Sequence, residues 1–179
     1  RDLKIENFCD KNDIIFNSDD DICLLPINSV KTGNDETYKV FTPFHRNAEK
    51  VKVRKSKSNK YNNYSNIKKK LKYSCNPKKE IKYKKNENIR VRGGRENALN
   101  ILKKIKNFQD YNVDRNLPSL NTTTLSAYNK YGCVSIREVY EKFTKVLNKD
   151  NSLIKQLYWR DFYYNIAYSF PHVFGSAFK

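Results

Sequence analysis

The sequence lacks several features that mark common classes of protein. Its 179 residues include no methionine, one tryptophan, two histidines and five glycines. No apolar run is long enough to span a bilayer, so no membrane helix is predicted. The four cysteines (Cys9, Cys23, Cys75 and Cys133) show no CxxC spacing and the histidines lie far apart, which argues against a metal site. We expect reduced thiols in an intracellular protein.

The chain begins at Arg1 without a methionine, so we expect it to be an excerpt or a trimmed product. No signal-peptide pattern opens it. With 38% hydrophobic and 13% aromatic residues, the composition is typical of a soluble and at least partly globular protein. No Ser/His/Asp, Cys/His or HExxH arrangement is present, so the residues do not indicate nucleophilic or metal catalysis.

One segment holds nearly all of the positive charge. The net charge is +17, and residues 45–92 contain 18 Lys and Arg side chains against three acidic ones, which leaves only +2 for the rest. The segment is rich in Lys, Asn and Tyr and shows no sustained period of 2 or 3.6. We therefore predict a basic low-complexity linker over 45–92, which is either a solvated connector or an attractor of a phosphate backbone.

The residues before the linker predict the C-terminal end of an α/β domain over 1–44. The runs "DICLLP" (21–26) and "YKVFTPF" (38–44) flank the turn-rich "KTGNDET", a pattern typical of short buried strands or strand ends. They are too few for an independent domain. We expect the body of that domain to lie before Arg1.

Helical patterns dominate after the linker, over 93–179. The stretch "GGRENALNILKKIKNF" has an apolar helical face with lysines opposite, and a short helix is predicted to end at Gly132, a C′ glycine. Ser135 and Glu138 open "SIREVYEKFTKVL" at capping-box spacing. A last helix is predicted from about Ser152 to Tyr168. The chain is therefore predicted to be mostly α.

Five motifs, in order, carry a family resemblance. They are "YKVFTPF", a variable linker, "GGRENAL", "YNVDRNLPSLNTTTLSAYNKYGCVSIREVY" and "QLYWRDFYYNI". Together they resemble the photolyase/cryptochrome family of flavin-dependent blue-light proteins. The resemblance implies an α/β domain, able to hold an antenna chromophore of folate or deazaflavin type, joined by a linker to a helical domain that binds FAD. Residues 93–179 would be the N-terminal part of that domain, with the rest beyond Lys179 or on a companion chain.

The resemblance also implies contacts with FAD. Tyr111 matches a tyrosine that lines the flavin pocket, although a core tyrosine fits the same pattern. The hydroxyl-rich stretch after it matches a phosphate grip and equally fits the N-cap of a helix. This stretch consists of Thr122, Thr123, Thr124, Leu125 and Ser126. Gln156, Arg160 and Tyr163, in the last helix, are expected at the same cofactor.

The last helix carries the residues that the resemblance assigns to the substrate. Trp159 matches a tryptophan that stacks against an extruded pyrimidine dimer, and ordinary aromatic core packing is the alternative. Gln156 and Arg160 share its helical face, and Arg160 matches an arginine that serves anionic groups of the cofactor or DNA. Cyclobutane-dimer photolyases commonly have Glu in place of Gln156, whereas (6-4) photolyases and animal-type cryptochromes commonly have Gln. The lesion type therefore stays open.

The resemblance predicts a DNA photolyase, a carbon-carbon lyase that repairs pyrimidine dimers in DNA with light and reduced FAD. Two alternatives stay open. One is a cryptochrome-like FAD photoreceptor without repair activity, and the other is an inactive, truncated relative that binds nucleic acid.

Overall fold

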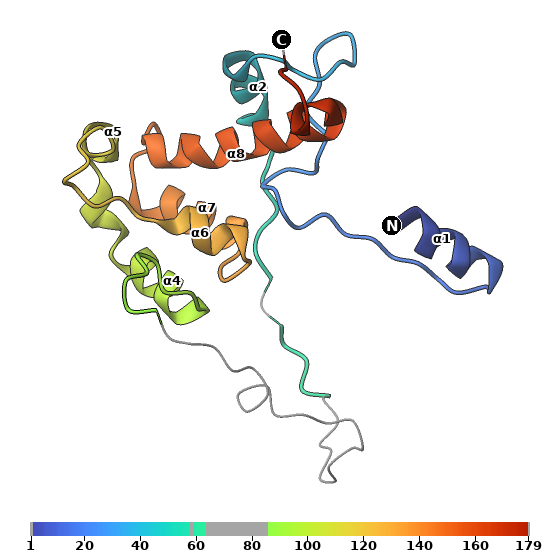
Figure 1. The fold of residues 1–179 in the computed structure, drawn as a ribbon, viewed down its shortest axis with the longest axis horizontal. Helices are drawn as coiled ribbons and strands as arrows, with labels where there is room; N and C mark the ends of the chain where they lie inside the picture. Colours follow the sequence, from blue (N-terminus) through green and yellow to red (C-terminus); the bar gives the residue numbers. More distant parts are fainter. Residues whose placement is uncertain (1, 58, 64–85, 179) are drawn as a thin grey trace.

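The computed structural model describes residues 2–57, 59–63 and 86–178, and these are mostly helical, as predicted (Figure 1). The middle of the predicted linker and Cys75 lie outside the described residues. The α-helices are α1 (Asp2–Lys11), α2 (Phe41–Ala48), α4 (Arg95–Lys103), α5 (Tyr111–Asp114), α6 (Leu125–Lys130), α7 (Ile136–Val146) and α8 (Ser152–Ser169). Two 3-10 turns are η1 (Ile105–Phe108) and η2 (Pro171–Phe174).

The longest helix, α8, lies at the centre of the packed body. It contacts α2, α5, α7 and η2, and Figure 1 shows α2 on one side of it and α6 and α7 on the other. Asn151 caps its start, because the Asn151 side chain accepts a hydrogen bond from the Leu153 N–H at 2.9 Å. The helix ends before Pro171, as predicted. Tyr158, Phe44 and Val139 are almost fully buried around it.

The capping box predicted for α7 is present. The Ser135 hydroxyl accepts a hydrogen bond from the Arg137 N–H, and the Glu138 carboxylate accepts one from the Ser135 N–H, both at 3.2 Å. Glu138 also pairs with Arg95 of α4 at 2.7 Å, and this hydrogen bond lowers the pKa of the Glu138 carboxyl. One carboxylate therefore both starts α7 and ties it to α4.

The strands predicted at 21–26 and 38–44 are wrong. Residues 22–25 form bends, Phe41 begins α2, and the β-bridge found in the described ranges is an isolated one between Lys31 and Thr37. Leu24 and Leu25 are buried, but their N–H groups donate to the Asp161 side chain of α8 and not to a neighbouring strand. The prediction that these apolar residues are buried is confirmed, but they pack against a helix and not within a sheet.

Residues 21–48 pack onto α8, across the predicted division between 1–44 and 93–179. The domain division itself stays a prediction. Helix α1 lies away from the other helices in Figure 1 and exposes Leu3 and Phe8. Over the residues that the structure describes, no helix is both long and apolar enough to cross a membrane.

Candidate functional site

Gln156 and Trp159, both predicted to face the substrate, line one hollow of about 590 Å³ at the N-terminal half of α8. The other residues that line it are Gln109, Asn112, Arg115, Asn148, Asp150, Asn151, Ser152 and Lys155. Five of the ten side chains are amides, two are cations and one is an indole ring. Amides and hydroxyls can hydrogen-bond the edges of a nucleobase, a ring can stack on its face, and cations can pair with phosphate.

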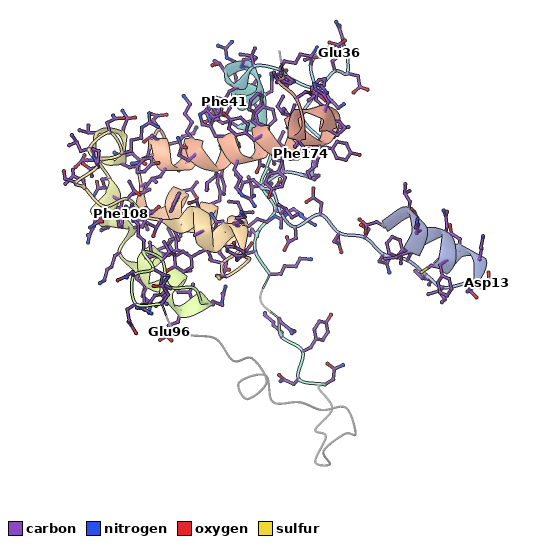
Figure 2. The ribbon with its side chains drawn as sticks, in the orientation of Figure 1. Asp13, Glu36, Phe41, Glu96, Phe108 and Phe174 are labelled. Carbon is purple, nitrogen blue, oxygen red and sulfur yellow. The ribbon has the colours of Figure 1, made fainter. Side chains whose placement is uncertain are left out.

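Trp159 is held by a neighbour from a distant part of the chain. Its ring stacks on Phe41 of α2, with ring centroids 3.6 Å apart and planes 7° apart. Figure 2 labels Phe41 on α2, beside α8. Tyr163, one helical turn along, stacks on Trp159 at 5.5 Å and is 62% exposed. The indole is thus half-buried, and its orientation is fixed by the two rings that stack on it.

Two polar side chains that line the hollow, Ser152 and Lys155, have no hydrogen bond or ion pair with the described residues. The Ser152 hydroxyl is buried and has no hydrogen-bond partner. Lys155 is exposed, and its ammonium lies 5.9 Å from the centre of the Phe41 ring. A buried hydroxyl without a partner costs free energy, and the Ser152 oxygen is itself not exposed to the hollow.

Arg160 lies in a different hollow, of about 340 Å³, which it shares with Ile22 and Tyr164. Its guanidinium donates a hydrogen bond to the Ile22 carbonyl and covers the Tyr164 ring at 4.8 Å. The structure therefore does not bring Arg160 into the hollow of Gln156 and Trp159. Its role toward cofactor or DNA stays a prediction.

The sequence analysis did not identify Asp161 and Asn165, two buried residues of α8 that hold a distant segment of the chain in place. Asp161 is 1% exposed and accepts hydrogen bonds from the Leu24 and Leu25 N–H groups at 3.2 and 3.1 Å. Asn165 accepts one from the Asn28 N–H at 2.7 Å and donates to the Asp161 carbonyl. Burial raises the pKa of Asp161 to about 6, against the lowering effect of the two backbone donors. The signal that could have identified these two residues is an acidic and an amide side chain, four residues apart, in a helix rich in aromatic residues.

Of the predicted FAD contacts, Gln156 lines this hollow, whereas Tyr111 and residues 122–126 lie outside it. Tyr111 begins α5 and packs half-buried against the core, and neither it nor residues 122–126 line the hollow of Gln156 and Trp159. The Thr123 hydroxyl accepts from the Leu125 N–H at 3.4 Å, and the Thr124 hydroxyl donates to the Thr123 carbonyl at 2.7 Å. Thr124 adopts a left-handed conformation at the start of α6, with φ of 51°.

The hydroxyls of Thr122 and Ser126 have no partner among the described residues, and both side chains reach the surface. Two free hydroxyls beside a helix start form a donor set that suits a phosphate. Over the described ranges, no cluster of His, Cys, Asp or Glu is arranged to hold a metal ion.

Comparison with known proteins finds similarity to two photolyases. Over 58 residues the chain is 41% identical to a "(6-4)DNA photolyase" of Oryza sativa subsp. japonica, a match that covers 28% of this chain and 10% of that protein. Over 186 aligned positions it is 28% identical to a "Deoxyribodipyrimidine photo-lyase" of Alkalihalophilus pseudofirmus, covering 96% of this chain and 38% of that protein. No family model matches the chain. The chain thus spans much less than half the length of either relative and is weakly similar to both.

Proposed function

We propose that this chain is part of a light-dependent DNA repair flavoprotein of the deoxyribodipyrimidine photolyase type. The observation that carries the proposal is the hollow at the start of α8, where Gln156 and Trp159 meet two cations and several amides. The family resemblance had assigned these two side chains to one lesion-binding surface. The end-to-end similarity to a photo-lyase supports the same function.

FAD is the cofactor that the proposed function requires, and the donor set described above fits part of it. The hydroxyls of Thr122 and Ser126 would hold its phosphates, and the half-buried ring of Tyr111 would cover apolar cofactor surface. Thr123, Thr124 and Leu125 would shape this turn through their hydrogen bonds to one another. Bound in its reduced form, FAD supplies the electron that opens a pyrimidine dimer in blue light.

The chain's own residues would bind and orient the flipped dimer. Trp159, fixed by Phe41, would stack on the extruded bases, and the Gln156 amide would donate a hydrogen bond to a base carbonyl. Lys155 and Arg115, at the same hollow, would pair with flanking phosphates. Gln156 can donate a hydrogen bond but cannot supply a proton, which a glutamic acid at this place could do.

That glutamine favours a second candidate function, a cryptochrome-like FAD photoreceptor without repair activity. The resemblance associates Gln at this place with (6-4) photolyases and animal-type cryptochromes. The same hollow would then hold a ligand or a segment of the protein instead of a lesion.

A repair assay on the natural protein that contains these residues decides between the two. Cyclobutane-dimer and (6-4) oligonucleotides are incubated in parallel, with and without blue light, while the flavin spectrum is recorded. We expect light-dependent loss of one lesion, strongly reduced in Trp159→Ala and partly retained in Trp159→Phe. A flavin spectrum without repair would favour the photoreceptor, and no bound flavin would contradict both.

A further inference from the structure

Five lysines from three segments line two hollows that share Ser56. Lys55 and Lys57 of the linker border a hollow of about 940 Å³ that Ser56 also lines. A second hollow, of about 400 Å³, is lined by Ser56 and by lysines of α4 and α7. We call these side chains the lysine patch: Lys55, Lys57, Lys103, Lys142 and Lys145.

The first part of the predicted linker is fixed to the body. The N–H and the hydroxyl of Ser56 both donate to the Glu141 carboxylate of α7, at 2.5 and 3.1 Å. Arg54 donates to the Asp20 carbonyl at 3.0 Å, and Val53 packs against the core. These contacts hold Lys55 and Lys57 beside α7.

Three of the acids near the patch already have a partner in the protein. Glu138 pairs with Arg95, Glu141 accepts from Ser56, and Asp21 pairs with Arg137. The five lysines, by contrast, make no ion pair within the described part of the chain, and four of them are exposed. Asp19, which also lines the larger hollow, has no hydrogen-bond or ion-pair partner among the described residues. The patch therefore carries more positive than negative charge, although Lys103 donates a hydrogen bond to the Asn100 side chain at 3.4 Å.

We propose that the lysine patch binds the phosphate backbone of duplex DNA, as a contact separate from the hollow of Gln156 and Trp159. The two surfaces share no lining residue. Free lysine ammonium groups are point charges that pair with phosphates whatever the base sequence, and each contact releases condensed counterions. The choice of DNA over another polyanion rests on the proposed function. The patch would add affinity, and the α8 hollow would add preference for the lesion.

The salt dependence of binding to an undamaged oligonucleotide duplex tests this proposal. We expect Lys103→Gln/Lys142→Gln/Lys145→Gln to lower the slope of log K against log salt by about 3, since each lost phosphate contact removes about one. A matched control, Lys4→Gln/Lys11→Gln/Lys39→Gln, removes the same charge from exposed positions that line neither the patch nor the hollow of Gln156 and Trp159, with two of its positions on the distant helix α1 (Figure 1). Equal slopes for the two triple variants would overturn the proposal.

The contact between Ser56 and Glu141 permits a second test, in which charge and geometry predict opposite results. Glu141→Ala removes a negative charge, which alone would strengthen binding to DNA, but it also releases Lys55 and Lys57 from α7. Glu96→Ala, at an exposed position of α4 (labelled in Figure 2), removes the same charge without touching Ser56. We expect Glu141→Ala to bind more weakly than Glu96→Ala by about threefold at equal salt. Stronger binding by Glu141→Ala would contradict the fixed linker.

The two proposals fail separately. If the patch variant keeps its salt slope while Trp159→Ala loses preference for lesion over undamaged duplex, the patch proposal falls and the proposed function stands. If the slope falls but no lesion is preferred, the patch binds DNA and the repair function is contradicted. Loss of binding to vesicles of anionic lipid, with an unchanged slope on DNA, would assign the patch to a membrane surface and overturn the proposal.

Discussion

The two halves of α8 use their polar side chains in different ways. From Arg160 onward, the side chains of Arg160, Asp161 and Asn165 bind the protein itself, because they hold the backbone of residues 22–28. In the N-terminal half, Gln156 lies at the hollow with no hydrogen-bond partner among the described residues, and Trp159 is fixed there by Phe41. A polar group without an internal partner is available to a ligand, whereas one that satisfies buried N–H groups is not.

This difference separates two meanings of the motif "WRDFY". Its Trp159 lines the hollow that we propose to bind a lesion, whereas its Asp161 fixes the segment that brings α2, and so Phe41, against α8. Arg160, Asp161 and Asn165, which we call the supporting set, therefore hold in place the surface of Gln156 and Trp159, which we call the exposed set. Variants of the supporting set should change stability, and variants of the exposed set should change binding.

The largest effect is expected from Asp161→Ala. The substitution leaves the buried N–H groups of Leu24 and Leu25 without an acceptor and opens a small cavity. Each unsatisfied group costs about 1–3 kcal/mol, so we expect the free energy of unfolding to fall by about 4 kcal/mol near pH 5. Denaturant unfolding followed by circular dichroism measures it. A loss below about 1 kcal/mol would show that water replaces the carboxylate freely.

The contribution of Asp161 to the free energy of unfolding should depend on pH. Because the pKa of Asp161 is raised to about 6 in the folded protein from 3.8, its protonated form is favoured by folding. The stability that this group contributes is fully present below about pH 4 and is lost as the pH rises through 6. We expect the difference in unfolding free energy between the natural protein and Asp161→Asn to shrink by about 3 kcal/mol between pH 4 and pH 8. A difference that grew with pH would mean that the backbone donors outweigh burial.

Trp159→Ala should have an intermediate effect on stability and a large one on lesion binding. It removes a half-buried ring and its stacking on Phe41, which we expect to lower the free energy of unfolding by about 2 kcal/mol. Trp159→Phe keeps part of the stacking and should lose less than half of that. Thermal unfolding of both variants and their binding to lesion-containing duplex are measured in parallel. The two measurements check whether Trp159 contributes both to stability and to binding.

Local signals in the sequence predicted much of the helical part. The capping box of Ser135 and Glu138 is formed, and Gly132 ends the short helix with φ of 64°, a conformation that glycine adopts without strain. The bounds of α8 followed from its aromatic run and from Pro171. Each of these signals acts within a few residues, so one stretch of sequence is enough to read it.

What the sequence did not reveal depends on contacts between distant residues. Leu24 looked like part of a strand because it is apolar and flanked by turn residues, and only the Asp161 side chain shows why it is buried without a sheet. Phe41 and Trp159 are both aromatic, but nothing local pairs them. The fixing of the linker at Ser56 likewise depends on Glu141, which is 85 residues away. Hydrophobic periodicity carries no information about such partners.

The smallest change in stability is expected from Gln156→Ala, and it gives the sharpest form of the comparison. Gln156 is half-buried on α8 and supports no other residue through a described hydrogen bond, and alanine is the better helix former. We expect the free energy of unfolding to change by no more than about 0.5 kcal/mol, while affinity for lesion-containing duplex falls about fivefold because one hydrogen bond to a base is lost. Asn165→Ala, nine residues along the same helix, should do the reverse, since it leaves the Asn28 N–H unpaired and lies outside the hollow. If both variants lowered stability equally, the two halves of α8 would not differ as described, and Gln156 would belong to the supporting set.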